Sequence, residues 1–188
     1  MVWRLVVAVL LVVAAVVADG MIEDEPAAPR RVAEKPHVAG CAHQSIASFP
    51  GAFTSAGNLV VGPLALIGAG EPTTPATVRE FGGNKFPAVV RAGRTVTMEV
   101  RGRRASLFYA KHGGVLTGTR VADGDGAVTF RSCGRRRAKS DADGDPVTFW
   151  SGFVLVARPM CVRLTVRAGS DRVRHAAIPL GRRCDPPG

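Results

Sequence analysis

Four cysteines have the widest choice of chemistry in this chain: Cys41, Cys133, Cys161 and Cys184. A cysteine thiolate can attack a carbonyl group, bind a metal ion or be oxidised to a disulfide. Four cysteines behind an N-terminus typical of exported proteins favour two disulfides, for which three pairings exist. The pairing Cys133–Cys161 with Cys41–Cys184 is favoured, because Cys133 ends one expected strand, Cys161 begins another, and Cys41 and Cys184 bound the domain.

Cys133 also lies in a sequence that could belong to a thiol enzyme. Thr129-Phe-Arg-Ser-Cys133 resembles the Thr-Leu-x-Thr-Cys active-site strand of sortases, which are extracytoplasmic β-barrel transpeptidases. The resemblance implies a nucleophilic Cys133, which would need a histidine within reach and an arginine to stabilise the oxyanion. The motif is imperfect, because Phe130 and Ser132 replace Leu and Thr and His112 lies close upstream. A structural disulfide is therefore the preferred interpretation of Cys133.

Two groups of side chains could bind a metal ion. They are His37 with Cys41 and His43, and Met160 with Cys161 and His175. A blue-copper site places its Cys, one His and its Met close together on one loop, and His175 is too far along the chain from Cys161 for that. A metal carrier is thus an alternative rather than the leading hypothesis.

Asp141, Asp143 and Asp145 have the alternate spacing of a calcium-binding loop. Such a loop needs glycine at its sixth position and a bidentate glutamate at its twelfth, where this chain has Pro146 and Gly152. A solvated acidic turn is the prediction. The sequence therefore indicates no metal ion, no cofactor and no complete set of catalytic residues.

The chain is strongly basic, with 25 Lys and Arg against 15 Asp and Glu and a formal net charge of +10. The densest clusters are residues 135–139, 101–104 and 182–183. A basic surface attracts polyanions through a field that salt screens, so anionic envelope polymers or a membrane surface are the candidate partners. Aromatic residues make up only 6% and no recognition motif is present, which argues against nucleic acid. No small-molecule substrate or oligomeric state is indicated, and arginine richness that serves solubility alone is the alternative.

The N-terminus has the three regions of a secretory signal peptide. Met1–Arg4 are followed by an apolar run over residues 5–18, with Val16 and Ala18 before Asp19. The run is shorter than the roughly 20 residues that span a bilayer, although an uncleaved anchor remains the alternative. Residues 19–40 are rich in proline and charge, which predicts a flexible linker. The expected organisation is a signal helix (1–18), a linker (19–40) and an extracytoplasmic domain (41–188), secreted or tethered to the outer face of the membrane.

Short strands separated by turns dominate the expected domain, since the chain has 22 Gly and 13 Pro. Residues 94–101 alternate cleanly, with Val96, Met98 and Val100 on one face. Further strands are predicted over 104–110, 127–133, 161–167 and 172–180. The apolar runs 58–69 and 147–157 predict strands covered on both faces, with Pro63 at an edge or bulge. The fold class is therefore all-β: a single antiparallel β-sandwich, immunoglobulin-like or cupredoxin-like, of about seven to nine short strands.

Several segments together carry a family resemblance. They are Asn58-Leu-Val-Val-Gly-Pro-Leu, Lys85-Phe-Pro-Ala-Val-Val-Arg-Ala-Gly, Phe130-Arg-Ser-Cys133, Thr148-Phe-Trp-Ser-Gly-Phe153 and Cys161-Val-Arg-Leu. Over about residues 57–184 the chain resembles a group of small exported actinobacterial proteins of uncharacterised function. The resemblance implies one β-sandwich domain behind a signal peptide or anchor, and it implies no activity.

The leading hypothesis is an exported, non-catalytic protein of the cell envelope that acts as a binding or structural module with a basic surface. Two disulfides would hold its domain together. The alternatives are an extracytoplasmic thiol enzyme that uses Cys133 and a metal carrier.

Overall fold

The computed structural model describes residues 35–45, 49–110, 119–140 and 144–185. The expected signal segment, most of the expected linker, His112, Asp141 and Asp143 lie outside the described residues. In the part of the chain that the structure describes, no helix has the length and apolar character needed to cross a membrane.

Thirteen strands form three sheets within these residues. The first sheet has the order β1 (His37–Ala39), β8 (Ala127–Arg131), β6 (Thr95–Val100), β12 (Met160–Ala168), β13 (Arg174–Leu180). The second has the order β2 (Leu59–Val61), β3 (Leu64–Leu66), β5 (Ala88–Arg91), β10 (Pro146–Trp150), β9 (Lys139–Ser140). The third has the order β4 (Gly83–Lys85), β11 (Gly152–Val156), β7 (Ala105–Tyr109). Every pairing is antiparallel except that of β1 with β8, so the chain is mostly β and the first sheet is mixed.

The helical elements among the described residues are short. They are η1 (Cys41–His43), α2 (Pro75–Phe81) and η2 (Val121–Asp123), of which η1 and η2 are 3₁₀ turns. Thr74 begins α2, because its hydroxyl accepts a hydrogen bond from the Thr77 amide. Gly82 ends α2 with φ 68°, the left-handed conformation that glycine adopts without strain.

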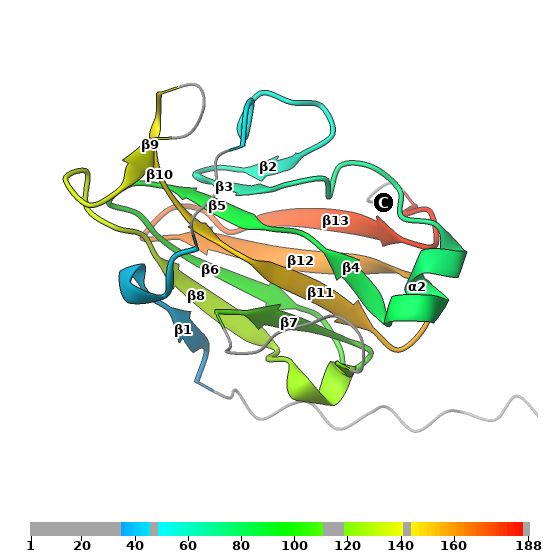
Figure 1. The fold of residues 1–188 in the computed structure, drawn as a ribbon. Coiled ribbons are helices and arrows are strands. Elements are labelled where there is room, and N and C mark those ends of the chain that lie inside the picture. The colour runs from blue at the N-terminus through cyan, green and yellow to red at the C-terminus, as the bar shows by residue number, and fades with distance from the viewer. Residues whose placement is uncertain (1–34, 46–48, 111–118, 141–143, 186–188) are drawn as a thin grey trace, which may run out of the picture. The chain divides into compact units, whose positions relative to one another are not determined.

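The three sheets share one hydrophobic core. Only Ser151 separates β10 from β11, so the second and third sheets follow one another along the chain and lie across the first (Figure 1). Val90 of the second sheet, Leu107 of the third and Leu164 of the first are all buried in this core. The arrangement is compatible with a β-sandwich.

The alternating patterns of the sequence predicted the inward faces correctly. Val96, Met98 and Val100 of β6 are at most 4% exposed, and the inward residues of β8 and β12 are equally buried. The strands predicted over 104–110 and 172–180 are β7 and β13. The second half of each apolar run is covered on both faces, since every residue of β3 and β11 is buried, whereas Val60 of β2 is 41% exposed. The outer face of the second sheet, which includes Val89 and Phe149, packs against Phe49 and Phe53.

The structure has thirteen strands rather than the seven to nine expected, because both apolar runs divide in two and because β1, β4, β5 and β9 were not predicted. Residues 58–69 form the hairpin β2–β3, and residues 147–157 form β10 and β11. Gly62 and Pro63 make the two-residue turn of that hairpin, in which Gly62 has φ 61°. Pro63 therefore marks a turn, and its expected place at an edge or bulge was wrong.

The folded region begins before Cys41, inside the segment expected to be a linker. β1 pairs in parallel with β8, and Ala39 is fully buried. The composition of residues 19–40 predicted a flexible linker. Backbone hydrogen bonding to a distant strand cannot be detected from local composition. The boundary at residue 41 is corrected accordingly.

An aromatic cluster lies where the three sheets meet. The Phe130 ring of β8 is 5.2 Å from the Tyr109 ring of β7, edge to face, and 5.2 Å from the Trp150 ring of β10. The Tyr109 hydroxyl donates a 2.7 Å hydrogen bond to the Phe86 carbonyl oxygen. Gly152 pairs with Tyr109, and a Cβ at Gly152 would lie only 2.1 Å from the tyrosine ring. Tyr109 thus requires glycine at residue 152.

Tyr109 is the only tyrosine of the chain, so its ionisation can be followed by the ultraviolet absorbance of tyrosinate. Burial raises the pKa of its hydroxyl above the usual tyrosine value. The folded protein should therefore give no tyrosinate signal at about pH 11, whereas the chain unfolded in urea should titrate near the ordinary value of about 10. The unfolded state loses this proton first, so the free energy of unfolding should fall by roughly 1.4 kcal/mol per pH unit above about pH 10. Tyr109→Phe is the spectroscopic blank, and a native titration near pH 10 would contradict the buried placement.

Candidate functional site

The four cysteines form two disulfides, Cys41–Cys133 and Cys161–Cys184, so no described cysteine is free. The number of disulfides agrees with the sequence analysis, but the favoured pairing was wrong. β8 and β12 are both antiparallel to β6 and therefore run in the same direction. The end of β8, near Cys133, and the start of β12, near Cys161, consequently lie at opposite ends of the first sheet.

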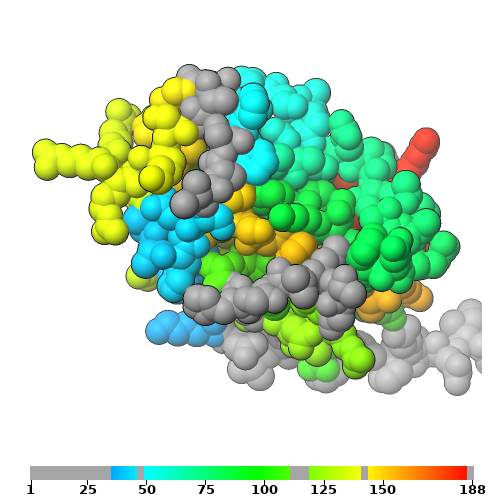
Figure 2. Space-filling model, viewed as in Figure 1, coloured from blue at the N-terminus to red at the C-terminus, as the bar shows by residue number. Residues whose placement is uncertain are grey.

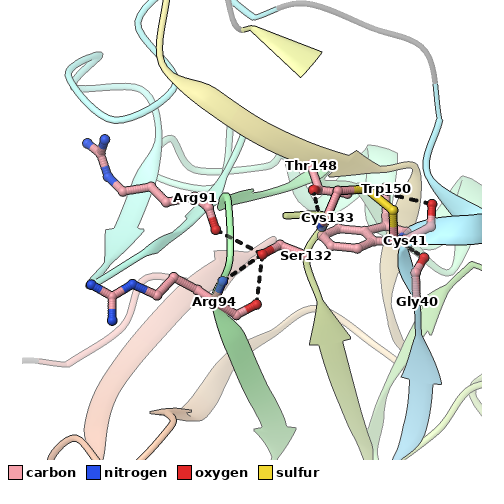
Figure 3. Close-up of a disulfide and its surroundings, with 8 residues drawn as sticks. All are labelled: Gly40, Cys41, Arg91, Arg94, Ser132, Cys133, Thr148 and Trp150. Carbon is pink, nitrogen blue, oxygen red and sulfur yellow. Dashed lines mark hydrogen bonds between the residues drawn. A yellow bond between two sulfur atoms is a disulfide. The ribbon is translucent and has the colours of Figure 1, made fainter. Parts of the chain in front are cut away.

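β1 brings Cys41 to Cys133. Because β1 lies beside β8, the residues that follow the two strands meet at the same end of the sheet, with a Cα–Cα distance of 4.9 Å (Figure 3). The Cys133 side chain is only 1% exposed. The Cys133 amide donates a 2.7 Å hydrogen bond to the buried Thr148 hydroxyl, and the Trp150 indole donates one to the Gly40 carbonyl. Both cysteines are thus held by their neighbours.

Ser132 anchors the other side of Cys133. Its hydroxyl oxygen accepts a 2.7 Å hydrogen bond from the Arg94 amide, and it lies 2.8 Å from the Arg94 carbonyl oxygen and 3.0 Å from that of Arg91. The guanidinium groups of both arginines point away from the disulfide (Figure 3). Sulfur in a disulfide has no thiol to ionise, so this arrangement offers no nucleophile while the bond persists. The region is built as a structural joint.

The candidate metal ligands are not brought together. Cys41 and Cys161 are both in disulfides. His175 lies opposite Thr165, four residues along β12 from Cys161 and so about 13 Å away. No group of three or more His, Cys, Asp or Glu side chains suited to a metal ion occurs among the described residues. Of the three spaced aspartates only Asp145 is described, and its carboxylate pairs with the exposed Arg91 guanidinium.

A second feature is a pocket of about 550 Å³ lined by five arginines, which we call the arginine pocket. Its charged residues are Arg104, Arg158, Arg163, Arg182, Arg183 and Asp185. Pro159, Met160 and Cys161 complete its wall. All five arginines are exposed to solvent.

Three segments supply the arginine pocket. Arg104 directly precedes β7, Arg158 lies in the connection from β11 to β12, and Arg163 is on the outward face of β12. Arg182 and Arg183 follow β13, where the chain turns at Gly181 with φ 71°. A Cβ at Gly181 would lie 2.9 Å from Pro159, so the turn also requires glycine.

The disulfide Cys161–Cys184 closes this turn, since it ties the residues after β13 to the start of β12. Arg182 and Arg183 are therefore fixed near Arg163. Arg104 is joined to the same region, because its carbonyl oxygen accepts a 3.0 Å hydrogen bond from the Ala157 amide. Covalent and backbone bonds hold the arginines close together against their mutual repulsion.

Two of the three basic clusters named from the sequence contribute to this pocket, and the third does not. Residues 101–104 and 182–183 each supply arginines. Residues 135–139 lie in and beyond the turn after β8, on the opposite side of the molecule from the C-terminal segment (Figure 2). Sequence analysis missed Arg158 and Arg163, because each stands alone in an apolar segment. Alternation with apolar neighbours marks Arg163 as an outward residue, but only the pairing of β12 with β13 shows which residues lie beside it.

Comparison of the chain with protein-family models, with curated proteins and with solved structures gives no significant match.

The two disulfides should differ in their contribution to stability. Cys41 and Cys133 are 92 residues apart in sequence, against 23 for Cys161 and Cys184. Loop-closure entropy gives about 4.6 kcal/mol for the longer loop and about 3.4 kcal/mol for the shorter one. Urea unfolding should therefore show a larger loss in the free energy of unfolding for Cys41→Ser/Cys133→Ser than for Cys161→Ser/Cys184→Ser. Peptide mapping without reduction checks the pairing itself, and a Cys133–Cys161 peptide would contradict it.

Proposed function

We propose that this protein is an exported, non-catalytic module of the cell envelope that binds anionic envelope polymers or the outer membrane surface through its basic side. Its fold would be a single β-sandwich of immunoglobulin-like or cupredoxin-like type. The resemblance to small exported actinobacterial proteins agrees with this proposal. The observation that carries it is the arginine pocket, a concentration of positive charge that the Cys161–Cys184 disulfide and backbone hydrogen bonds hold in place.

The disulfides support the proposed location. Disulfides form and persist in oxidising compartments and are rare where thiol reductants are abundant. All four cysteines are paired, and each pair joins segments that the sheet already places side by side. A chain that folds outside the cytoplasm would keep both bonds.

The same bonds count against the two alternatives. A thiol enzyme using Cys133 would need a reduced, accessible sulfur, whereas this side chain is bonded to Cys41 and 1% exposed. A metal carrier would need Cys41 or Cys161 as a thiolate ligand, and both are oxidised. Neither alternative gains a specific observation in its favour.

Binding to an anionic surface should depend on salt. We expect the oxidised protein to sediment with vesicles of anionic lipid at about 50 mM salt and to be released several-fold at about 200 mM, because mobile ions screen exposed charges. Vesicles of zwitterionic lipid are the control. Retention that does not change over this range would remove the basic surface as the cause of binding.

The non-catalytic part of the proposal needs an activity assay. Peptidoglycan fragments incubated with the protein should not be hydrolysed or joined, with or without a reductant. Cys41→Ala/Cys133→Ala and Cys41→Ala distinguish the outcomes, because only the second leaves Cys133 as a free thiol. If the protein or Cys41→Ala shows turnover and the double variant does not, catalysis by Cys133 would replace the non-catalytic module as the leading hypothesis.

A further inference from the structure

The arginine pocket concentrates positive charge in one place. Five arginines and one aspartate, Asp185, give it a net charge of +4. No ion pair to Arg158, Arg163, Arg182 or Arg183 occurs among the described residues. Guanidinium groups do not lose their charge at any pH that proteins tolerate, so their repulsion persists until an anion compensates it.

The shape of the site favours a compact ligand over a flat surface. A volume of about 550 Å³ lies in the range of roughly 300–1,000 Å³ that small-molecule sites occupy. The arginines come from three separate segments, so their side chains border one hollow from different sides rather than forming a row. An extended polymer with widely spaced charges would meet only some of them at once.

The density of arginines selects among anions. A carboxylate, a sulfate ester or a phosphodiester carries one charge, whereas a phosphomonoester carries about −1.5 to −2 at pH 7 and has three strong acceptor oxygens. The planar donor fork of arginine binds phosphate oxygens in pairs. A terminal phosphate or a diphosphate therefore matches both the charge and the donors of the pocket.

The pocket is also organised before any ligand arrives. The Cys161–Cys184 bond and the turn at Gly181 fix the backbone of Arg182 and Arg183, and strand pairing with Ala177 fixes that of Arg163. Binding then has to order only the arginine side chains, so less affinity is lost to ordering.

We propose that the arginine pocket is a binding site for a terminal phosphate or diphosphate group, at which Arg158, Arg163, Arg182 and Arg183 contact the phosphate oxygens. This inference rests on the proposed function, because it names the anionic group that the envelope module recognises. The phosphate belongs either to a lipid headgroup or to a soluble or polymer-borne ester.

Calorimetry with inorganic pyrophosphate and methyl phosphate tests the site, using the full oxidised protein. We expect one binding site, and no measurable binding of methyl sulfate at the same concentration. Arg182→Gln/Arg183→Gln should weaken pyrophosphate binding at least about tenfold, since each lost hydrogen bond to a charged group is worth that much or more. Arg135→Gln/Arg136→Gln is the matched control, because it removes the same charge from an exposed adjacent pair outside the pocket. It should change the affinity by less than about twofold.

A third variant tests the role of the disulfide. Cys161→Ser/Cys184→Ser keeps every arginine but frees the chain after Gly181, so pyrophosphate binding should weaken under conditions in which the variant is still folded. Unfolding temperatures of all three variants provide that check. Equal weakening by both arginine pairs, or equal binding of methyl sulfate, would overturn the pocket as a phosphate site.

The two sources of phosphate are separated with vesicles. Vesicles with phosphatidic acid carry a terminal phosphate, and vesicles with phosphatidylglycerol, adjusted to equal surface charge, carry only a diester. A lipid headgroup is the source if the protein sediments more strongly with phosphatidic acid, if pyrophosphate competes with this sedimentation, and if Arg182→Gln/Arg183→Gln abolishes it. A soluble or polymer-borne ester is the source if pyrophosphate binding depends on the pocket arginines but the protein does not prefer phosphatidic acid vesicles. Salt-sensitive sedimentation without any pyrophosphate binding would overturn the pocket proposal and leave the envelope-binding proposal standing.

Discussion

The contact of Phe130 with Tyr109 and Trp150 is the interaction on which the rest of this structure depends, because its three rings come from three different sheets. Tyr109 can reach Phe130 only because Gly152 has no side chain, and the Tyr109 hydroxyl is satisfied by the Phe86 carbonyl oxygen. Trp150 extends the same cluster to the Gly40 carbonyl, beside Cys41. A change at any one of these residues would therefore be felt in the core, in the joint between β10 and β11 and at the first disulfide.

These residues also explain the segments that seemed most distinctive in the sequence. Phe130, Cys133, Thr148, Trp150 and Gly152 all belong to the aromatic cluster or to the setting of the Cys41–Cys133 disulfide. Their types and spacing are those of an architectural unit, since Thr148 satisfies the amide of Cys133 and Gly152 makes room for a ring. In this chain the segment that resembles a catalytic strand therefore also meets the packing demands of the aromatic cluster and the first disulfide.

Alternation along single strands was sufficient to predict the buried faces of β6, β8 and β12, because that pattern is local. The disulfide pairing was not predictable in the same way. It depends on β6 standing between β8 and β12, and on β1 joining the edge of β8, both of which are long-range pairings. The arginine pocket was hidden for the same reason. Arg104 and Arg183 are far apart in the chain, and only the turn at Gly181 and the Cys161–Cys184 bond bring their segments to one place. Local sequence therefore predicted which residues are buried and which are charged. Which distant segments lie side by side could be learned only from the structure.

The order of the two disulfides along the chain has a mechanical consequence for a protein held at one end. The bonds enclose residues 41–133 and 161–184 without overlapping, so a force that pulls on the two ends passes through the sulfur atoms and bypasses both enclosed segments. Between the bridges only residues 134–160 can be drawn out, an extension on the order of 90 Å. The enclosed segments bear little of the load. They contain the rings of Tyr109 and Phe130 and four of the pocket's five arginines, namely Arg104, Arg163, Arg182 and Arg183. Such a domain would yield by a short, fixed length under tension and then resist as a covalent chain.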